Sequence, residues 1–440
     1  MEIPMILAWL GYLMILVFML LIMKKKFHSF CALLLVPFAF GVIACLYTGT
    51  PVFALGDYAG DGIKSVAGTF SLLMFAVIFF GTMISTGLFD PIVNTLVRMM
   101  KGDPMRVLVF TSIMAAFVSL DGDSTTCTLI CCTALVPIYN RLGIKKLYLA
   151  GTIVMQITVM NLLPWGGPTA RVIAVLGLNA EDMFHPLIPG MIAAVLWNVF
   201  VAYLNGMKER RRLGIISIDT AELMGKVSDE ELAYKRPKLF WFNATLTILS
   251  IVVLVLGWFA PNVVFAVAAA FALIVNYSNP DDQRDLLNQH GANAIPVISM
   301  VIAAGVLMGV MNGTGMADAM GSSLASIVPE SLSSYYAVFI AIISSAGTFF
   351  LSNDAFFYGV LPVLAETGVS FGFTPLTIGI AGVLGQAFHM ASPLVGFLYL
   401  LLSLTDTTLI DLQKFLLKWC SGIFVLYLVC GFLTGALHIL

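Results

Sequence analysis

Charged residues are scarce in this sequence. Only 10% of its 440 residues are Asp, Glu, Lys or Arg, whereas about a quarter are charged in a soluble domain. Sixty per cent are hydrophobic, and the mean hydropathy is +0.99. Apolar segments of about 17 or more residues follow one another, so the composition excludes a soluble globular protein. It predicts an all-α polytopic protein of the cell (plasma) membrane, with the lipid bilayer as a partner and no nucleic acid.

Enzyme and cofactor motifs are also missing. The Gly-x-Gly words, such as the one at Gly313, have no strand before them and no lysine after them, so ATP-driven chemistry is not expected. No HExxH or GxSxG word is present, which argues against a protease or hydrolase. The seven cysteines have no metal-type spacing with histidine. The sequence therefore predicts a non-enzymatic protein with no permanently bound cofactor.

The apolar segments define ten membrane spans and two broken segments. The spans are expected at 3–23, 28–47, 66–88, 147–178, 187–206, 239–259, 262–278, 294–311, 374–404 and 415–438. Segments 107–140 and 332–365 are hydrophobic but interrupted by polar residues in the middle. Each arm of the first has about 13 residues, or about 20 Å of helix, which is too short for a ~30 Å core. Both are therefore predicted to be re-entrant hairpins.

The distribution of basic residues predicts the orientation. Lys24, Lys25 and Lys26 follow the first span and place its end in the cytoplasm. Alternation of the spans then puts every Lys and Arg except Lys64 and Arg171 on the cytoplasmic side or in the cytoplasmic loop. In this arrangement the first hairpin enters from the cytoplasm, the second enters from outside, and both termini lie outside.

The two halves carry matching words. Thr86-Gly87-Leu88-Phe89-Asp90 corresponds to Thr314-Gly315-Met316-Ala317-Asp318, 228 residues later, and Pro168 corresponds to Pro393, 225 residues later. These offsets predict two inverted repeats of five spans and one hairpin each, with broken helices near the membrane midplane. Residues 1–206 form the first repeat, 207–238 a charged cytoplasmic linker, and 239–440 the second repeat.

The interruptions of the hairpins contain the most costly residues. The first hairpin has Ser119, Asp121, Gly122, Asp123, Ser124 and Thr125, and the second has Ser352, Asn353 and Asp354. A carboxylate at membrane depth costs about 2.5–3.5 kcal/mol, so these residues are expected to face a cavity, a partner or an ion. Free helix ends at a hairpin tip favour anionic groups, and the carboxylates favour a cation or a proton. The alternative is that the aspartates only cap helices.

Two long spans are also interrupted. Asn161, Gly166, Gly167 and Thr169 belong to a Pro- and Gly-containing break, and His389 and Ser392 belong to its counterpart, 386–393. Irregular backbone at this depth must be buried in protein or line a cavity. Arg171 follows the first break, where it either binds a carboxylate or extends toward the outer surface. His389 is either a proton relay or a hydrogen-bonded packing residue.

These words resemble those of the citrate–divalent-metal/proton symporter family within the ion transporter superfamily. The most specific are Asp121-Gly122-Asp123-Ser124-Thr125-Thr126, the 166–171 word ending in Arg171, and the 354–362 word beginning at Asp354. The likeness runs nearly end to end. It implies uptake of citrate as a complex with a metal such as Mg²⁺ or Ca²⁺, coupled to protons, in a homodimer with a scaffold and a moving domain. Sodium-coupled relatives have Ser-Asn-Thr at both hairpin tips, which this chain lacks, so proton coupling is expected.

The resemblance and the chemistry together define a candidate site. Asp121, Asp123 and Asp354 are expected to face the metal of the substrate complex or to take up protons, with His389 as a further proton carrier. Twelve further residues are expected to bind the substrate: Ser119, Gly122, Ser124, Thr125, Asn161, Gly166, Gly167, Thr169, Arg171, Ser352, Asn353 and Ser392. The alternatives are a proton- or sodium-coupled carrier of an unmetallated di- or tricarboxylate or another small anion, and an ion channel with carboxylate rings.

Overall fold

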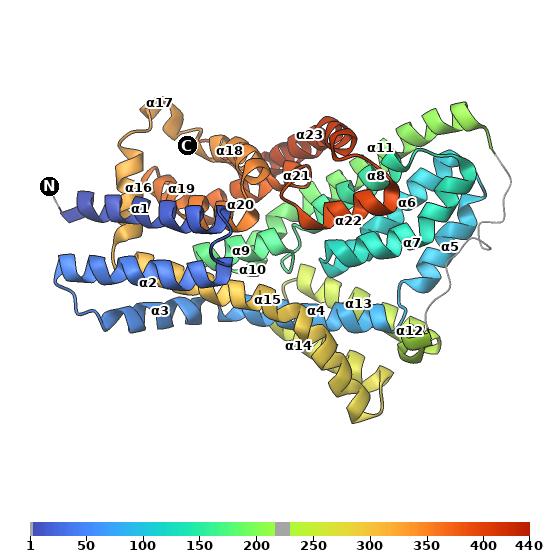
Figure 1. Ribbon diagram of the computed structural model, residues 1–440, viewed down its shortest axis with the longest axis horizontal. Coiled ribbons are helices and arrows are strands. Elements are labelled where there is room, and N and C mark those ends of the chain that lie inside the picture. Colours follow the sequence, from blue (N-terminus) through green and yellow to red (C-terminus); the bar gives the residue numbers. More distant parts are fainter. Residues whose placement is uncertain (1–2, 216–228) are drawn as a thin grey trace.

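The fold described here is that of a computed structural model, which describes residues 3–215 and 229–440. Helices are its only regular elements within those ranges, and eight of them are long and apolar enough to cross a membrane. The all-α class and the membrane-spanning character predicted from composition are therefore confirmed. Most helices run along the long axis of the molecule, with α16 lying across them at one end (Figure 1).

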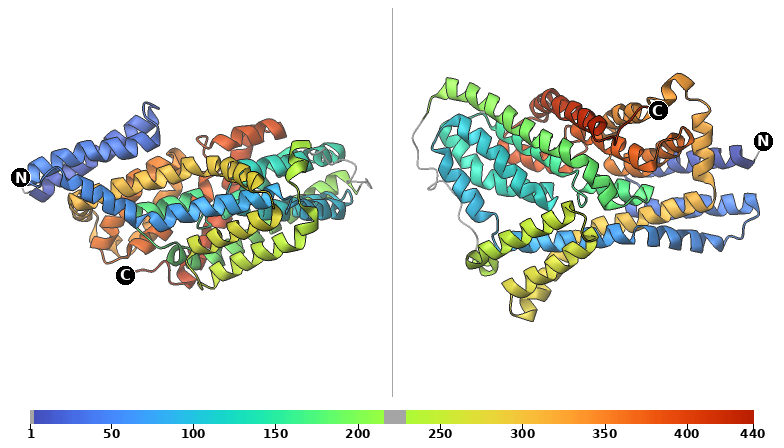
Figure 2. Two further views of the ribbon diagram at one scale, coloured as in Figure 1. Left: turned by 90° about the horizontal axis from the view of Figure 1, so that it is seen from below. Right: turned by 180° about the vertical axis from the view of Figure 1, so that it is seen from behind.

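The first half contains α1 to α11. Its helices are α1 (Ile3–Met23), α2 (Ser29–Thr48), α3 (Ala54–Ser65), α4 (Ala67–Ser85), α5 (Asp90–Met100), α6 (Pro104–Val118), α7 (Ser124–Leu142), α8 (Lys146–Met160), α9 (Gly167–Leu176), α10 (Ala180–Phe184) and α11 (Ile188–Leu213). Two 3₁₀ turns, η1 (Ser119–Asp121) and η2 (His185–Leu187), complete it. The α1–α2 pair lies at the edge of the molecule in both views of Figure 2.

The second half contains α12 to α23. It consists of α12 (Asp229–Tyr234), η4 (Pro237–Leu239), α13 (Phe240–Val255), α14 (Pro261–Asn276), α15 (Pro280–Gly313), α16 (Met316–Ala325), α17 (Glu330–Ser333), α18 (Tyr336–Phe350), the π-helical η5 (Ala355–Val360), α19 (Leu361–Ser370), α20 (Pro375–Leu384), α21 (Gln386–His389), α22 (Gly396–Thr405) and α23 (Leu409–Leu433).

Three helices are longer than the apolar runs that predicted them. The helix expected at 294–311 is α15, which begins at Pro280, where the Asn279 side chain accepts a hydrogen bond from the Asp281 N–H (3.1 Å). Hydropathy missed this start because the first turns are polar, although Asn-Pro-Asp-Asp is a regular helix-start sequence. The span expected at 66–88 is α4, and α3 precedes it with only Val66 between them. α11 continues to Leu213, so part of the expected linker is helix; residues 216–228 of that linker lie outside the described ranges.

Both broken segments are hairpins of antiparallel helices. In the first, α6 and α7 pack together, and Thr111 and Tyr139 share a hydrogen bond (3.0 Å) far from the tip. In the second, the Tyr336 hydroxyl of α18 donates to the Leu364 carbonyl of α19 (3.2 Å). The helices end where aspartate, glycine and serine interrupt the apolar sequence, as expected, and the two tips lie in the interior of the molecule.

Candidate functional site

A cavity lies where the two hairpin tips meet two interrupted helices. Its volume is about 350 Å³. The hairpin tips contribute Gly122, Asp123, Ser124, Ser352, Asn353 and Asp354 to its wall. The interrupted helices contribute Asn161, Gly167, Pro168, Arg171, His389, Met390, Leu394, Val395, Gly396 and Phe397. The four sequence interruptions, spread over more than 270 residues, therefore form one site.

Four helices begin at this cavity. They are α7, α9, η5 and α22, and residues from the start of each line the wall. The starts of α9 and α22 have no side-chain cap, because Gly166 and Val395 occupy their N-cap positions. Their first N–H groups therefore lack intrahelical and side-chain acceptors. Helix N-termini carry partial positive charge, so the arrangement suits an anionic ligand.

The tip of the first hairpin is held by its own aspartates. Gly122 has φ +81°, a left-handed conformation that favours glycine, and the Asp121 carboxylate accepts the Asp123 N–H (2.9 Å). Asp123 caps α7 by accepting the N–H groups of Thr125 (3.1 Å) and Thr126 (3.0 Å). The capping alternative therefore describes the bonds of Asp123, although this residue also lines the cavity.

Trp165 fastens the first hairpin to the neighbouring helices. Its indole N–H donates to the Leu120 carbonyl (2.8 Å), and its ring stacks on Phe80 of α4 with the centroids 5.3 Å apart. A side chain at Gly122 would press against the same indole ring, at 3.2 Å. The tip and the first break are thus packed as one unit against α4.

The second hairpin tip contains one cap and one amide pair. The Ser352 hydroxyl accepts the Ala355 N–H (3.2 Å) at the start of η5. The Asn353 side-chain oxygen accepts a hydrogen bond from the buried Gln386 amide (2.9 Å). Because this bond occupies the oxygen of Asn353, its NH₂ group remains to donate toward the cavity. The pair joins the hairpin tip to the second interrupted helix.

The only ion pair in the described part of this cavity joins Arg171 and Asp354. The guanidinium Nε donates to the carboxylate over 2.8 Å, and each side chain is 21% exposed. His28 and Ser29, in the α1–α2 connection, lie beside the same carboxylate. A partly buried pair of this kind costs desolvation, which strong mutual attraction offsets. Arg171 therefore lies in the cavity wall rather than extending toward the surface.

The two interrupted helices are shaped by close backbone contacts. A side chain at Gly166 would lie 2.2 Å from the Asn161 carbonyl oxygen, so only glycine fits this turn. In the second break, His389 Nδ1 is 2.6 Å from the Thr348 carbonyl. A carbonyl can only accept, so Nδ1 carries the hydrogen and Nε2 is the acceptor nitrogen. The buried Ser392 hydroxyl accepts the Leu394 N–H (3.2 Å).

Ten of the sixteen predicted site residues line the cavity, and six do not. Ser119 and Asp121 are buried behind the first tip, and Thr125 is on the exposed side of α7. Gly166, Thr169 and Ser392 lie in the second layer, where they shape the two turns. In the described ranges, no three His, Cys, Asp or Glu side chains are grouped to hold a metal. Asp121, Asp123 and Asp354 therefore do not form one cluster.

Sequence reasoning did not single out four residues beside this cavity. Gln386 orients Asn353, His28 and Ser29 approach Asp354, and Phe397 lines the wall. A buried glutamine next to Pro393 in an apolar segment is a usable signal, because buried amides need partners. His28 and Ser29 carried no signal, since their contact depends on how α1 and α2 pack on the second half.

Comparison with known proteins agrees with this arrangement. The profile of the citrate transporter family (CitMHS) matches residues 6–385. This chain belongs to the citrate transporter family. It is 43% identical over 430 residues to a citrate transporter of Bacillus subtilis (strain 168), covering 98% of this chain and 99% of that protein. It is 42% identical to the Mg(2+)/citrate complex secondary transporter of the same organism, with the same coverage.

The family assignment makes this chain a multi-pass transporter of the plasma membrane and not an enzyme. The crystal structure of the Alcanivorax borkumensis YdaH transporter has a similar fold, with a TM-score of 0.58, 13% identity and 87% of each chain covered. At that identity the likeness concerns the fold alone. The resemblance noted from the hairpin and break words is therefore confirmed at the level of the family.

Proposed function

We propose that this protein takes up citrate as a complex with a divalent metal, Mg²⁺ or Ca²⁺, coupled to protons, by alternating access. The observation that carries the proposal is the cavity in which four helix N-termini converge beside two carboxylates and one guanidinium. Such a wall offers donors to carboxylate groups and oxygen ligands to a hard cation at the same time. The name of the Mg(2+)/citrate relative supports the metal in the substrate.

The charges of the wall favour the complex over free citrate. Asp123 and Asp354 contribute two negative charges and Arg171 one positive charge. Citrate is mostly a trianion at neutral pH, and one divalent cation reduces its charge to −1. Free citrate would bring three negative charges to a wall that is already negative, whereas the bound metal supplies the counter-charge for Asp123 and Asp354. The metal is thus part of the cargo.

We assign the carboxylates of citrate to the uncapped starts of α9 and α22. Gly167 and Gly396 begin these helices, and their neighbouring N–H groups have no side-chain acceptor. Ser124 and the Asn353 amide add neutral donors from the hairpin tips. The guanidinium of Arg171 has further N–H groups beyond the one that binds Asp354. Arg171 can therefore hold a substrate carboxylate while it stays beside Asp354.

Among the three aspartates, we assign the coupling proton to Asp121. Asp354 is paired with Arg171, and Asp123 accepts two backbone N–H groups. Asp121 is buried and, among the described residues, has no ion-pair partner. A buried carboxyl without a cation exchanges a proton more readily than one held in an ion pair. His389 remains a second candidate because its Nε2 is free to accept a proton.

We further propose that 1–206 and 239–440 are inverted repeats with re-entrant hairpins. The corner after α4 and the corner after α15 support this, because Gly87 (φ +76°) and Gly315 (φ +75°) have the same left-handed conformation. Gly143 (φ +68°) and Gly372 (φ +100°) likewise end the two hairpins. The order long helix, short helix, hairpin, interrupted helix and long helix occurs in both halves. A homodimer is part of the same proposal.

The proposal is tested with purified protein in proteoliposomes that contain a pH-sensitive dye. Citrate uptake is measured alone and with Mg²⁺, Ca²⁺, Mn²⁺ or Zn²⁺, with and without an inward proton gradient. We expect metal-dependent uptake accompanied by proton entry. Uptake of free citrate at the same rate would support a carrier of the unmetallated anion, and non-saturating flux would support a channel.

A further inference from the structure

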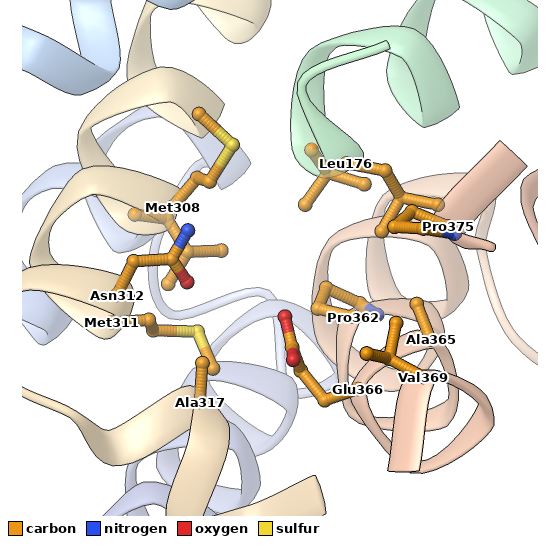
Figure 3. Close-up of a pocket in the computed structure, with 12 residues that line it drawn as sticks. Leu176, Met308, Met311, Asn312, Ala317, Pro362, Ala365, Glu366, Val369 and Pro375 are labelled. Atoms are coloured by element: carbon orange, nitrogen blue, oxygen red, sulfur yellow. The ribbon is translucent and has the colours of Figure 1, made fainter. Parts of the chain in front are cut away.

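A second, smaller cavity lies apart from the citrate site. It has a volume of about 50 Å³ and lies between α15, α16 and α19, with the ends of α9 and α20 closing it. Its wall is apolar except for Glu366 of α19 and Asn312 of α15. Figure 3 shows the Glu366 carboxylate pointing into the space toward Met311 and Asn312. One water molecule needs about 10–15 Å³, so water can bring a proton to this carboxylate.

Glu366 has no cation beside it. In residues 3–215 and 229–440, no Lys, Arg or His lies within ion-pair distance of its carboxylate. Asp318 of α16 is the charged group near enough to act on it, and its charge has the same sign. A carboxylate against apolar side chains is destabilised by lost hydration and by a like charge. Taking up a proton removes both penalties.

The helices packed around α19 provide no permanent positive charge for Glu366. Neither α20 nor the 307–312 stretch of α15 has a titratable residue. The titratable and charged side chains on the other packed elements are Asp318 of α16, Tyr336 of α18, Tyr358 of η5, Tyr12 of α1 and Arg171 of α9. Arg171 is held by Asp354, so the ionised form of Glu366 faces an apolar and acidic wall.

The position of Glu366 connects this cavity to the citrate site. Asp354 and Glu366 lie on one helical run of the second hairpin, twelve residues or about 18 Å apart. α19 and α16 approach so closely that a side chain at Gly321 would lie 2.6 Å from the Glu366 Cβ. Met308 and Met311 of α15 face the carboxylate across the cavity. The charge of Glu366 thus acts where the hairpin contacts α15 and α16.

We infer that Glu366 is a second proton-binding site, and that its protonation allows the second hairpin to move against α15 and α16. A neutral carboxyl can pass the methionine wall, whereas an ionised one loses its hydration there. The inference rests on the proposed transport function, because it assumes that the hairpin moves during alternating access. It differs from the role of Asp121, since Glu366 does not line the citrate cavity.

The test compares Glu366→Gln, which mimics the protonated form, with wild type in counterflow exchange of metal–citrate at about pH 5.5 to 8.5. Wild-type exchange should fall at alkaline pH, while Glu366→Gln should stay at least about five-fold faster than wild type at the alkaline end. The ratio at each pH cancels changes in citrate speciation. Asp318→Asn, an exposed carboxylate on the facing helix, is the matched control and should follow wild type. A flat wild-type profile, or a Glu366→Gln profile parallel to wild type, would overturn the inference.

A second measurement uses unmodified protein and does not depend on the variant's folding. An apolar carbodiimide reacts with protonated carboxyls in apolar surroundings, so peptide mass spectrometry should find Glu366 modified and exchange inhibited. Recovery of the Glu366 peptide without modification would also overturn the inference. If wild type exchanges no metal–citrate at any pH, the proposed function fails, while the labelling result still reports on Glu366.

Discussion

Arg171 and Asp354 form a 2.8 Å ion pair that joins the first interrupted helix to the tip of the second hairpin, 183 residues away. The pair lies in the wall of the citrate cavity and connects the two halves of the chain at that point. It keeps the guanidinium in the cavity and lowers the net negative charge of the wall. The substrate therefore meets a pre-arranged pair rather than an isolated carboxylate.

Arg171→Lys should weaken metal–citrate binding by about ten-fold or more, because hydrogen bonds to charged groups contribute about 1.5–3 kcal/mol and lysine loses the planar geometry. The rank order of metals should not change, since the carboxylates remain. Binding to purified protein by titration calorimetry measures both. The control is Arg212→Lys, at the exposed end of α11, where Arg212 pairs with Glu209. Wild-type affinity in Arg171→Lys would place the substrate carboxylates elsewhere.

Asp123 can be separated into a cap and a charge. Asn caps helices as well as Asp does, so Asp123→Asn should keep thermal stability but lose most metal–citrate affinity. Asp123→Ala should lose affinity and also about 1 kcal/mol of stability. Asn279→Ala, at the cap of α15, is the control, and should lower only the melting temperature. If Asp123→Asn transports like wild type, the residue is a cap alone.

Gln386 should act through Asn353. Gln386→Ala removes the bond that directs the Asn353 amide group, and we expect uptake affinity to fall about five- to ten-fold. Asn353→Ala should give a similar loss, and the double variant should be no worse than either single variant. Additive losses in this double-mutant cycle would show that the two side chains act independently.

The topology can be read from thiol labelling. In a variant without the seven native cysteines, Lys145→Cys and Thr314→Cys should react with an impermeant maleimide from the cytoplasmic and outer faces respectively. The reason is that Lys145 lies at the base of the first hairpin among basic residues, whereas Thr314 lies at the inverted corner. Labelling of both from the same side would contradict the inverted repeats.

The sequence predicted the hairpins and helix breaks because their signals are local. Gly122 takes a left-handed conformation, Gly166 accepts no side chain, and Asp123 caps a helix, all within a few residues. The Arg171–Asp354 and Gln386–Asn353 contacts could not be predicted, since they depend on how the two halves pack. α15 was drawn too short because hydropathy ignores a polar first turn.

Glu366 shows a different limit. It is a carboxylate in an apolar helix, which is the signal that marked Asp121 and Asp354, yet it does not interrupt its helix. Attention to breaks rather than to charge left it out. An ionisable side chain at membrane depth is therefore informative even where the helix remains regular.

The most direct test of the central claim is to count metal and citrate together as they enter. Proteoliposomes receive labelled citrate with the metal that gives the fastest uptake, and both are measured inside over the same initial interval, with a chelator series at fixed total citrate. The account predicts that they enter in a one-to-one ratio and that uptake falls with the concentration of the complex. Citrate entry that is unchanged by the chelator and is not accompanied by metal would contradict it.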